Sequence, residues 1–461
     1  MARLSLCLIA RDEEALLPAC LASVAGVVDE VVVADTGSRD GTARVARERG
    51  ARVLEVPWRD DFSEPRNATL AAASGDFVLI LDADERLAPG SGPRLRAALE
   101  GARFDCGMIR LHNARSVDAD PALVLAGAAR LGPPNPLPRV LRRTADLRYE
   151  GIVHESVSDW LARRGMRVAG LDVDVIHLGA VEALRAERGK LERNLGLLRR
   201  RCALEPGSIT PFAYLALELA GSGRMPEARE VAERAWALLP GQPPDRSVLR
   251  LAVARALAAL WADQAAPALE AVALAEAAEG PQPDLAYLRG RALLRAALDH
   301  AAAERERALD QAEEAFRRAL SLATAHGLRQ YVAGAASWAA WTGVGHVLLW
   351  RGRAAEAGTA FRTALAEASD RPEPRLGEAE VLLEEGRPGE ALPRLEPLLD
   401  DAPDGWALAA EAALALGAAA DARGLAAAAE QRSGRGFRAP HRRERLDRLR
   451  ARLEEAAGRG S

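Results

Sequence analysis

The first 85 residues alternate short β-forming runs with stretches that have helical periodicity. The β-forming runs lie at 4–10, 30–34, 52–56 and 76–81, and helix-like stretches lie at 13–25 and 63–74. Strands that alternate with helices form βαβ units, and such units build a mostly parallel sheet. We therefore predict an α/β, Rossmann-like domain over residues 1–180. Within it, residues 105–179 read as mixed strands and irregular segments, and GPPNPLP at 132–138 as a surface loop.

The rest of the chain is rich in Ala and Arg, which favour helices. Apolar residues recur at helical spacing after residue 180 and predict a linking helix over 181–206; they are Val181, Leu184, Leu191, Leu195, Leu198 and Cys202. The segments 346–365 and 380–399 align with a period of 34 residues, which is the period of a tetratricopeptide repeat. We predict an all-α helical-repeat domain at 207–430, with ordinary helical packing as the alternative, and a charged helix or tail at 431–461.

Composition and charge narrow the classes of function. The formal net charge is −4 and both signs are interspersed, so nothing indicates a nucleic-acid partner. Four cysteines without a CxxC pair favour a reduced, cytoplasmic location. The first apolar run is too short for a membrane span and lacks a cleavage site, so we expect neither a signal peptide nor a transmembrane segment.

Carboxylates follow three of the predicted strands. They lie in ARDEE at 10–14, DTGSRDGT at 35–42 and DADE at 82–85. Ligands of such sheets bind beyond the carboxyl ends of the strands, so these segments predict a ligand site.

Together the three segments resemble the family 2 glycosyltransferases, whose fold is of the GT-A type, over about residues 4–180. The resemblance implies a nucleotide-sugar donor, for which we take a UDP-sugar, and an inverting reaction. It assigns nucleotide contacts to Asp12, Asp35 and Asp82, although helix capping explains Asp12 equally well. We expect Asp40 to cap the helix that begins at Gly41-Thr42.

A nucleoside diphosphate needs a divalent cation to neutralise its charge as the sugar leaves. Asp82 and Asp84 lie two residues apart after an apolar strand, and Mg²⁺ or Mn²⁺ prefers such oxygen ligands. His177, at the end of the last predicted strand, is a candidate third ligand. The alternatives are a polar turn at 82–84 and a structural His177. The other histidines, at 112, 300, 326, 346 and 441, show no ligand spacing.

Two further segments resemble a subset of this family that includes proteins with C-terminal repeats and the peptide S-glycosyltransferases of bacteriocins. They are DFSEPRN at 61–67, where Arg66 is a candidate partner of a carboxylate or phosphate, and YEGIVHE at 149–155. Inversion needs a base that takes the acceptor's proton. Glu155 is the candidate, His154 is the alternative, and a favourable charge at a helix start is the structural explanation of Glu155.

The sequence lacks the motifs of two other classes of nucleotide-binding protein. ARDEE after the first strand lacks the glycines of a dinucleotide site, and no GxxxxGK[ST] occurs. A nucleotidyltransferase and a repeat scaffold with an inactive catalytic domain stay open as alternatives. For the repeats we expect recognition of a peptide, protein or glycan acceptor, or self-association into a homo-oligomer.

Overall fold

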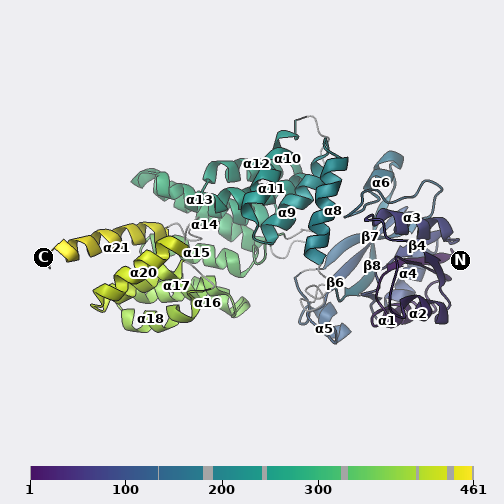
Figure 1. Ribbon diagram of the computed structural model, residues 1–461, viewed down its shortest axis with the longest axis horizontal. Coiled ribbons are helices and arrows are strands. Elements are labelled where there is room, and N and C mark those ends of the chain that lie inside the picture. Colours follow the sequence, from purple (N-terminus) through teal and green to yellow (C-terminus); the bar gives the residue numbers. More distant parts are fainter. Residues whose placement is uncertain are drawn as a thin grey trace. The chain divides into compact units, whose positions relative to one another are not determined.

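A computed structural model describes residues 2–132, 134–179, 190–240, 247–322, 331–400, 404–432 and 441–458 (Figure 1). The chain divides into two compact units, Met1–Pro206 and Gly207–Ser461.

The N-terminal unit is built on an eight-stranded sheet of order β3-β2-β1-β4-β7-β6-β8-β5. The strands are β1 (Leu4–Ala10), β2 (Glu30–Asp35), β3 (Arg52–Glu55), β4 (Phe77–Ile80), β5 (Glu85–Leu87), β6 (Cys106–Asn113), β7 (Asn135–Arg142) and β8 (Val168–His177). β3, β2, β1 and β4 run parallel, as do β6 and β8, while β7 and β5 pair antiparallel with their neighbours. The predicted α/β fold with a mostly parallel sheet is confirmed.

Helices cover both faces of this sheet. They are α1 (Leu17–Ser23), α2 (Thr42–Glu48), α3 (Ser63–Ala72), α4 (Ser91–Leu99), α5 (Pro121–Ala126), α6 (Ser158–Arg164) and α8 (Lys190–Leu204). Alternate residues of a strand point to opposite faces. Leu6 and Leu8 accordingly join the core under α1, α2 and α4, and Cys7 joins the core under α3 and α6 (Figure 1).

The expectation of a surface loop at 132–138 was wrong in part, because β7 begins at Asn135; residue 133 lies outside the described residues. Proline is tolerated in a strand where its missing N–H leaves no ladder bond unmade. Pro136 and Pro138 pair only with β6, next to a register shift at Gly107/Met108, whereas β4 pairs with β7 from Val140 onward. The prolines thus lie where one side of β7 has no strand partner.

The predicted linking helix is described from Lys190 as α8, which ends at Leu204 and lies within the N-terminal unit. Residues 181–189 of that prediction, with Val181 and Leu184, lie outside the described residues.

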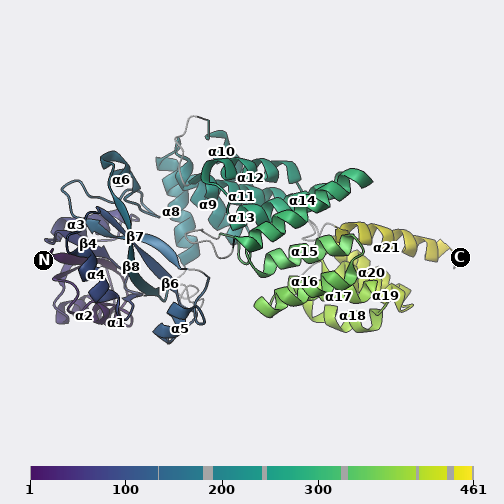
Figure 2. The same ribbon diagram turned by 180° about the vertical axis from the view of Figure 1, so that it is seen from behind.

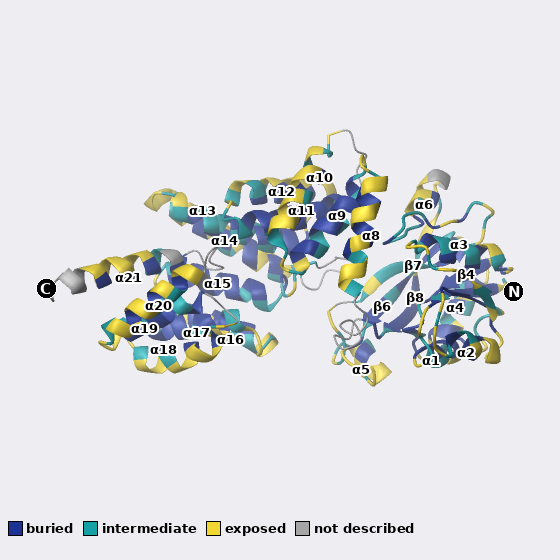
Figure 3. Cartoon of the chain, in the orientation of Figure 1, coloured by how far each residue is buried: buried dark blue, intermediate teal, exposed yellow. Residues whose placement is uncertain are grey.

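The described part of the second unit consists of helices and short 3-10 turns (Figure 2). The helices are α9 (Ile209–Gly221), α10 (Met225–Ala237), α11 (Ser247–Trp261), α12 (Ala265–Glu279), α13 (Pro283–Ala296), α14 (Ala302–Ser321), α15 (Trp338–Trp350), α16 (Ala354–Glu367), α17 (Pro372–Glu384), α18 (Pro388–Leu395), α19 (Gly405–Ala415), α20 (Ala419–Arg432) and α21 (His441–Gly458), with 3-10 turns Ala297–Asp299 and Glu396–Leu398. Consecutive helices pack on each other, and their buried residues gather on the facing sides (Figure 3). The all-α repeat architecture is confirmed.

Several of the turns inside the helical hairpins have a left-handed residue. Gly352 and Gly386, one repeat period apart, have φ of 70° and 71°, and Gly223 has φ of 79°. Asp263, between α11 and α12, takes the same conformation with φ of 64°. Asp tolerates this region better than most residues do, so the hairpin forms there without the glycine that marks the others.

Two findings concern cysteines and membranes. Cys7, Cys20, Cys106 and Cys202 are buried thiols rather than disulfides, and burial raises the pKa of Cys7 and Cys106 to about 12. Within the described ranges, no helix is both long enough and apolar enough to cross a membrane.

The buried carboxyl of Asp284, at the start of α13, gives the repeat unit a pH dependence. Its oxygens accept hydrogen bonds from the backbone N–H groups of Tyr331 (2.6 Å) and Val332 (3.1 Å), yet burial raises its pKa to about 7. The folded state therefore keeps a proton that the unfolded chain releases near pH 3.8. As pH rises from about 4 to about 7, this group should lower the free energy of unfolding by on the order of 3 kcal/mol.

The measurement is the thermal midpoint of the full chain against pH, compared with Asp284→Asn, which cannot titrate. We expect the difference between the two slopes to lie in this pH range, and parallel curves would contradict the assignment. An offset at low pH is expected as well, because the amide cannot accept both backbone hydrogen bonds.

Candidate active site

The carboxyl ends of β1, β2 and β4 form one edge of the sheet. The three strands are parallel, with β1 in the middle and Ala10 opposite Asp35. The chain runs outward from β1 to β2 and β3 and then returns to β4 on the other side, so the strand order reverses between β1 and β4. Ligands of open α/β sheets bind at such a reversal.

Asp35 ends β2 and shapes the loop that follows. Its Oδ1 accepts hydrogen bonds from the backbone N–H groups of Gly37 (3.0 Å) and Ser38 (2.8 Å), and Gly37 has φ of 99°. Within the described residues Oδ2 has no partner, although the residue is buried. Asp35 thus has one oxygen for the loop and one for a ligand.

Asp12 is bound to the same loop from the end of β1. Its Oδ1 accepts a hydrogen bond from the N–H of Arg39 (2.7 Å), and its own N–H donates to Ser38 Oγ (3.0 Å). Asp12 has φ of 53°, and its carboxylate is about half exposed. Asp40 caps α2 through Thr42 N–H (2.9 Å), as predicted. The structure gives Asp12 a role in fixing the loop.

Asp84 and His177 meet because β5 pairs with β8, with Glu85 opposite His177. His177 Nε2 lies 3.7 Å from Asp84 Oδ1, and His177 Nδ1 is 2.7 Å from Asn113 Oδ1. Burial holds the pKa of His177 below its ordinary value in spite of the nearby Asp84 and Asp82, which favours the neutral ring. A neutral imidazole oriented by a second hydrogen bond is a suitable metal ligand.

Gly179 lies close to both of these side chains. A Cβ on Gly179 would lie 2.2 Å from Asp84 Oδ2 and 2.7 Å from His177 Nε2, so any larger residue would collide with the pair. One carboxylate and one imidazole are ligands that Mn²⁺ or Mg²⁺ accepts. Lys190 Nζ also lies 3.7 Å from Asp84 Oδ2.

Asp82 is held by two arginines. Its Oδ1 accepts from Arg66 Nη2 (2.8 Å) and its Oδ2 from Arg139 Nη2 (3.2 Å). Burial would raise the pKa of Asp82, but the two guanidiniums hold it far below its ordinary value. Asp82 therefore stays ionised, and each of its carboxylate oxygens is paired with an arginine.

Glu85, the fourth residue of DADE, closes this network from β5. Its Oε1 accepts from Arg139 Nη2 (2.6 Å) and its Oε2 from the N–H of Asp82 (2.9 Å). Burial, together with the negative Asp82, raises the pKa of Glu85 to about 8 against the effect of Arg139. Glu85 thus holds the backbone N–H of Asp82 and also Arg139, which is one of the two ion-pair partners of Asp82.

Glu155 joins the network through Arg66. Its Oε1 accepts from Arg66 Nε at 2.6 Å, and the carboxylate is 12% exposed. Among the described residues Oε2 has no partner. His154, with φ of 50°, precedes it, and its carbonyl lies 3.5 Å from Arg201 Nη1. The segment that supplies the candidate base is therefore fixed by a buried cation.

The segments 61–67 and 149–155, which are far apart in sequence, are bound to each other. Asn67 and Tyr149 exchange two hydrogen bonds, of 3.0 and 2.7 Å, between side chain and backbone. Ser63 Oγ donates to the carbonyl of Gly151 (2.6 Å). Gly151 has φ of 92°, and a Cβ there would lie 2.5 Å from the guanidinium of Arg201 on α8. The two motifs are one structural element.

Sequence reasoning missed several residues of this site: Glu85, Asn113, Arg139, Gly179, Lys190 and Arg201. Glu85 and Arg139 lie within or beside segments that the motif comparison singles out, so their presence was visible but their pairing was not. Asn113, Gly179, Lys190 and Arg201 lie in no motif and are brought in by β6, β8 and α8.

Arg66→Met should destabilise the N-terminal unit. The change leaves Asp82 and Glu155 without their shared cation, and breaking a buried ion pair on one side costs about 3 kcal/mol or more. Urea unfolding of the full chain measures it. The control is Arg3→Met, since the exposed side chain of Arg3 has no ion pair in the described part of the chain. Equal stability of the two variants would refute the structural role of Arg66.

Two parts of the chain match models of known protein families. Residues 5–154 match the model of glycosyl transferase family 2, and residues 348–412 match a tetratricopeptide repeat model. A TPR repeat-containing protein of Synechococcus elongatus is 38% identical over 229 residues, 48% of this chain and 52% of that protein. Glucosyl-3-phosphoglycerate synthase of Mycobacterium tuberculosis is 39% identical over 92 residues, 18% of this chain and 28% of that enzyme.

A crystal structure of that synthase with Mn²⁺, UDP-glucose and phosphoglyceric acid aligns with 24% of this chain and 44% of that chain, at 33% identity and a TM-score of 0.21. The chain spans about half the length of the first relative and less than a third of the second. The family match ends at His154, so Glu155 and His177 rest on the geometry described above. Residues 5–154 belong to glycosyl transferase family 2, and residues 348–412 are tetratricopeptide repeats.

Proposed function

We propose that the chain is a metal-dependent glycosyltransferase that moves a sugar from a UDP-sugar to a peptide, protein or glycan acceptor with inversion. The observation that carries the proposal is the Asp84–His177 pair beside Gly179, at the edge of the sheet where β1, β2 and β4 end. An ion at this pair would neutralise the donor's diphosphate as it leaves.

The chain's own residues divide the donor between them. The free oxygen of Asp35 accepts a hydrogen bond from the uracil or the ribose, and the loop that Asp12 fixes lies beside it. Asp82, turned to Arg66 and Arg139, brings two guanidiniums to the same edge. Lys190 adds a cation next to Asp84, where a diphosphate would accept its hydrogen bonds.

Glu155 is the proposed base. Its Oε1 is held by Arg66, and its Oε2 takes the proton of the acceptor as the acceptor atom attacks the anomeric carbon. The bond from that carbon to the diphosphate breaks on the opposite face, which inverts the configuration. His154 is the alternative base, one residue earlier on the same loop.

The relatives support the reaction class. The name of the mycobacterial relative is that of an enzyme that makes a glucosyl derivative, and the matched family is one of glycosyl transferases. We further propose UDP as the donor nucleotide, Mn²⁺ or Mg²⁺ as the ion, and a peptide, protein or glycan as the acceptor.

Asp84→Ala should abolish turnover and leave the fold intact. Loss of a charge-stabilising ion is worth several kcal/mol, so we expect sugar transfer or donor hydrolysis to fall by at least about 1000-fold. The assay measures release of diphosphate from UDP-, GDP- and dTDP-sugars with and without Mn²⁺. Asp76→Ala is the control, since Asp76 precedes the same strand at its opposite end. Activity like that of the wild type in Asp84→Ala would overturn the metal assignment.

The same donors separate the enzyme from a repeat scaffold with an inactive domain. Calorimetric titration of the wild-type chain with each nucleotide sugar should give an affinity that depends on Mn²⁺. If neither binding nor release is detected with any donor, the scaffold becomes the better explanation.

Glu155→Gln should keep donor binding and lose transfer. A general base contributes about 100- to 10,000-fold, and the amide retains one oxygen for Arg66 but cannot take a proton. Transfer and donor affinity are measured side by side, with Glu150→Gln as control because Glu150 lies in the same loop and pairs with the exposed Arg148. Normal transfer by Glu155→Gln would direct the search for the base to His154.

A further inference from the structure

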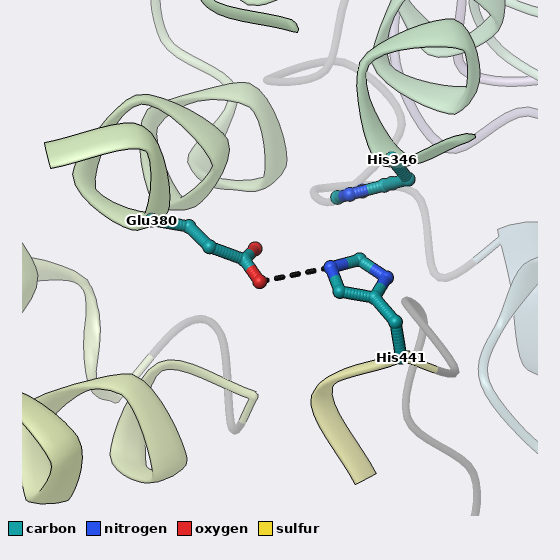
Figure 4. A group of neighbouring side chains, drawn as sticks. All are labelled: His346, Glu380 and His441. Atoms are coloured by element: carbon teal, nitrogen blue, oxygen red, sulfur yellow. Dashed lines mark hydrogen bonds and ion pairs between the residues drawn. The ribbon is translucent and has the colours of Figure 1, made fainter. Parts of the chain in front are cut away.

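Three buried side chains converge in the repeat unit from helices that are separate in sequence (Figure 4). His346 lies on α15, Glu380 on α17 and His441 at the start of α21. Their relative exposures are 6%, 0% and 4%. His346 and Glu380 are 34 residues apart, so they occupy the same position in successive repeats, and α21 brings the third group.

The three side chains have the geometry and the chemistry of a metal-binding group. One candidate ligand atom from each lies within 4.8 Å of the other two, and His441 Nε2 is 2.8 Å from Glu380 Oε1. Zinc binds imidazole nitrogen and carboxylate oxygen at about 2.0–2.2 Å, which puts ligand atoms about 3–4 Å apart. Small side-chain rotations therefore suffice to bind an ion.

Each of the two imidazoles has a buried nitrogen without a hydrogen-bond partner among the described residues. His346 makes no side-chain hydrogen bond within the described part of the chain, and Nδ1 of both rings is buried without a partner there. The aromatic rings of Phe361 and Trp350 lie beside the imidazoles, and they offer no conventional hydrogen-bond partner for the Nδ1 atoms. Burial, followed by the charge of Arg442, holds the pKa of His346 well below its ordinary value. His346 is thus a buried neutral imidazole, which is the form that binds metals.

The charges around the group leave room for a cation. Arg442 and Arg445, on α21, contact four carboxylates: Glu380, Glu384, Asp404 and Glu411. A third guanidinium, that of Arg291, also helps to lower the pKa of His346. These four carboxylates exceed the three guanidiniums by one negative charge.

The two oxygens of Glu380 have separate partners. Oε2 accepts a hydrogen bond from Arg442 Nε at 2.9 Å, while Oε1 faces His441 Nε2. Arg442 therefore orients the carboxylate and leaves Oε1 for an ion, as the outer partners of metal ligands do.

We propose that His346, Glu380 and His441 bind a divalent transition metal, with Zn²⁺ as the best fit, and that this ion fastens α21 to the repeats. Its ligands come from three helices, and it would add to the packing of α21 on α19 and α20 and to the ion pairs of Arg442 and Arg445 with α17. The site is independent of the glycosyltransferase proposal, because all its residues belong to the second unit.

Metal content of the full chain tests this site. To remove the contribution of the candidate active site, the test uses the Asp84→Ala chain, stripped with chelator, loaded with Zn²⁺ and dialysed. We expect one tightly held Zn²⁺ per chain. Adding His346→Gln should reduce the content to near zero, whereas adding His300→Gln, a change at a half-exposed histidine, should leave it unchanged.

Two readouts separate a metal site from a buried proton-sharing pair. Co²⁺ in place of Zn²⁺ should give the visible absorption of a four-coordinate ion, and Glu380→Gln should remove it. Zn²⁺ should raise the melting temperature of the Asp84→Ala chain and not that of the chain that also carries His346→Gln. If the Asp84→Ala chain retains no Zn²⁺ and gives no Co²⁺ absorption, the group is only a hydrogen-bonded pair and the proposal is overturned, even if the variants fold poorly.

Discussion

The guanidinium of Arg66 is the interaction on which the candidate active site depends. It binds Asp82, from the turn after β4, and Glu155, from the loop that precedes α6, at 2.8 and 2.6 Å. A buried cation is costly unless an anion lies beside it. Here two carboxylates from distant parts of the chain neutralise the guanidinium of Arg66. The distance between the metal motif and the candidate base is thereby fixed by one side chain. Arg139 repeats the arrangement with Asp82 and Glu85. The carboxylates are thus positioned before any ligand binds, which is the preorganisation that catalysis by charge stabilisation needs.

The candidate active site also depends on helix α8, which lies beyond the residues that match the family model. Arg201 donates to the carbonyl of Val153 at 2.7 Å and packs against Gly151, where no larger residue would fit. Lys190, at the other end of the helix, lies beside Asp84. A helix that follows the last strand therefore contacts both the loop of Glu155 and the Asp84–His177 pair. This explains why the compact unit ends at Pro206, well after β8.

Local patterns in the sequence predicted the first four strands, the helical second half and the acidic segments, because periodicity and strand-end position are properties of neighbouring residues. Contacts between distant residues leave no such record. Arg139 pairs with Asp82 and Glu85 because β7 lies beside β4. The sequence did not predict β7, because Pro136 and Pro138 are unusual in a strand. They are tolerated here because that part of β7 pairs with β6 alone. The hairpin of α11 and α12 has no turn glycine as a sequence signal, because Asp263 takes the left-handed conformation there. Glu380 and His441 are 61 residues apart, so no ligand spacing could reveal them.

The two histidine–carboxylate groups that are proposed to bind an ion differ in a way that matches their proposed roles. Structural zinc sites close their ligands around the ion, whereas catalytic sites leave a position open. The side chain of His177 is 23% exposed, whereas the side chain of His441 is 5% exposed and that of Glu380 is fully buried. Asp84 has only one imidazole beside it, so substrate oxygens must complete the coordination of an ion there. Glu380 has two imidazoles close by, and its second oxygen is taken by Arg442. Burial thus separates the two groups: the partly exposed pair at the edge of the sheet suits an ion that exchanges ligands with substrate, and the buried group between the helices suits an ion that stays in place.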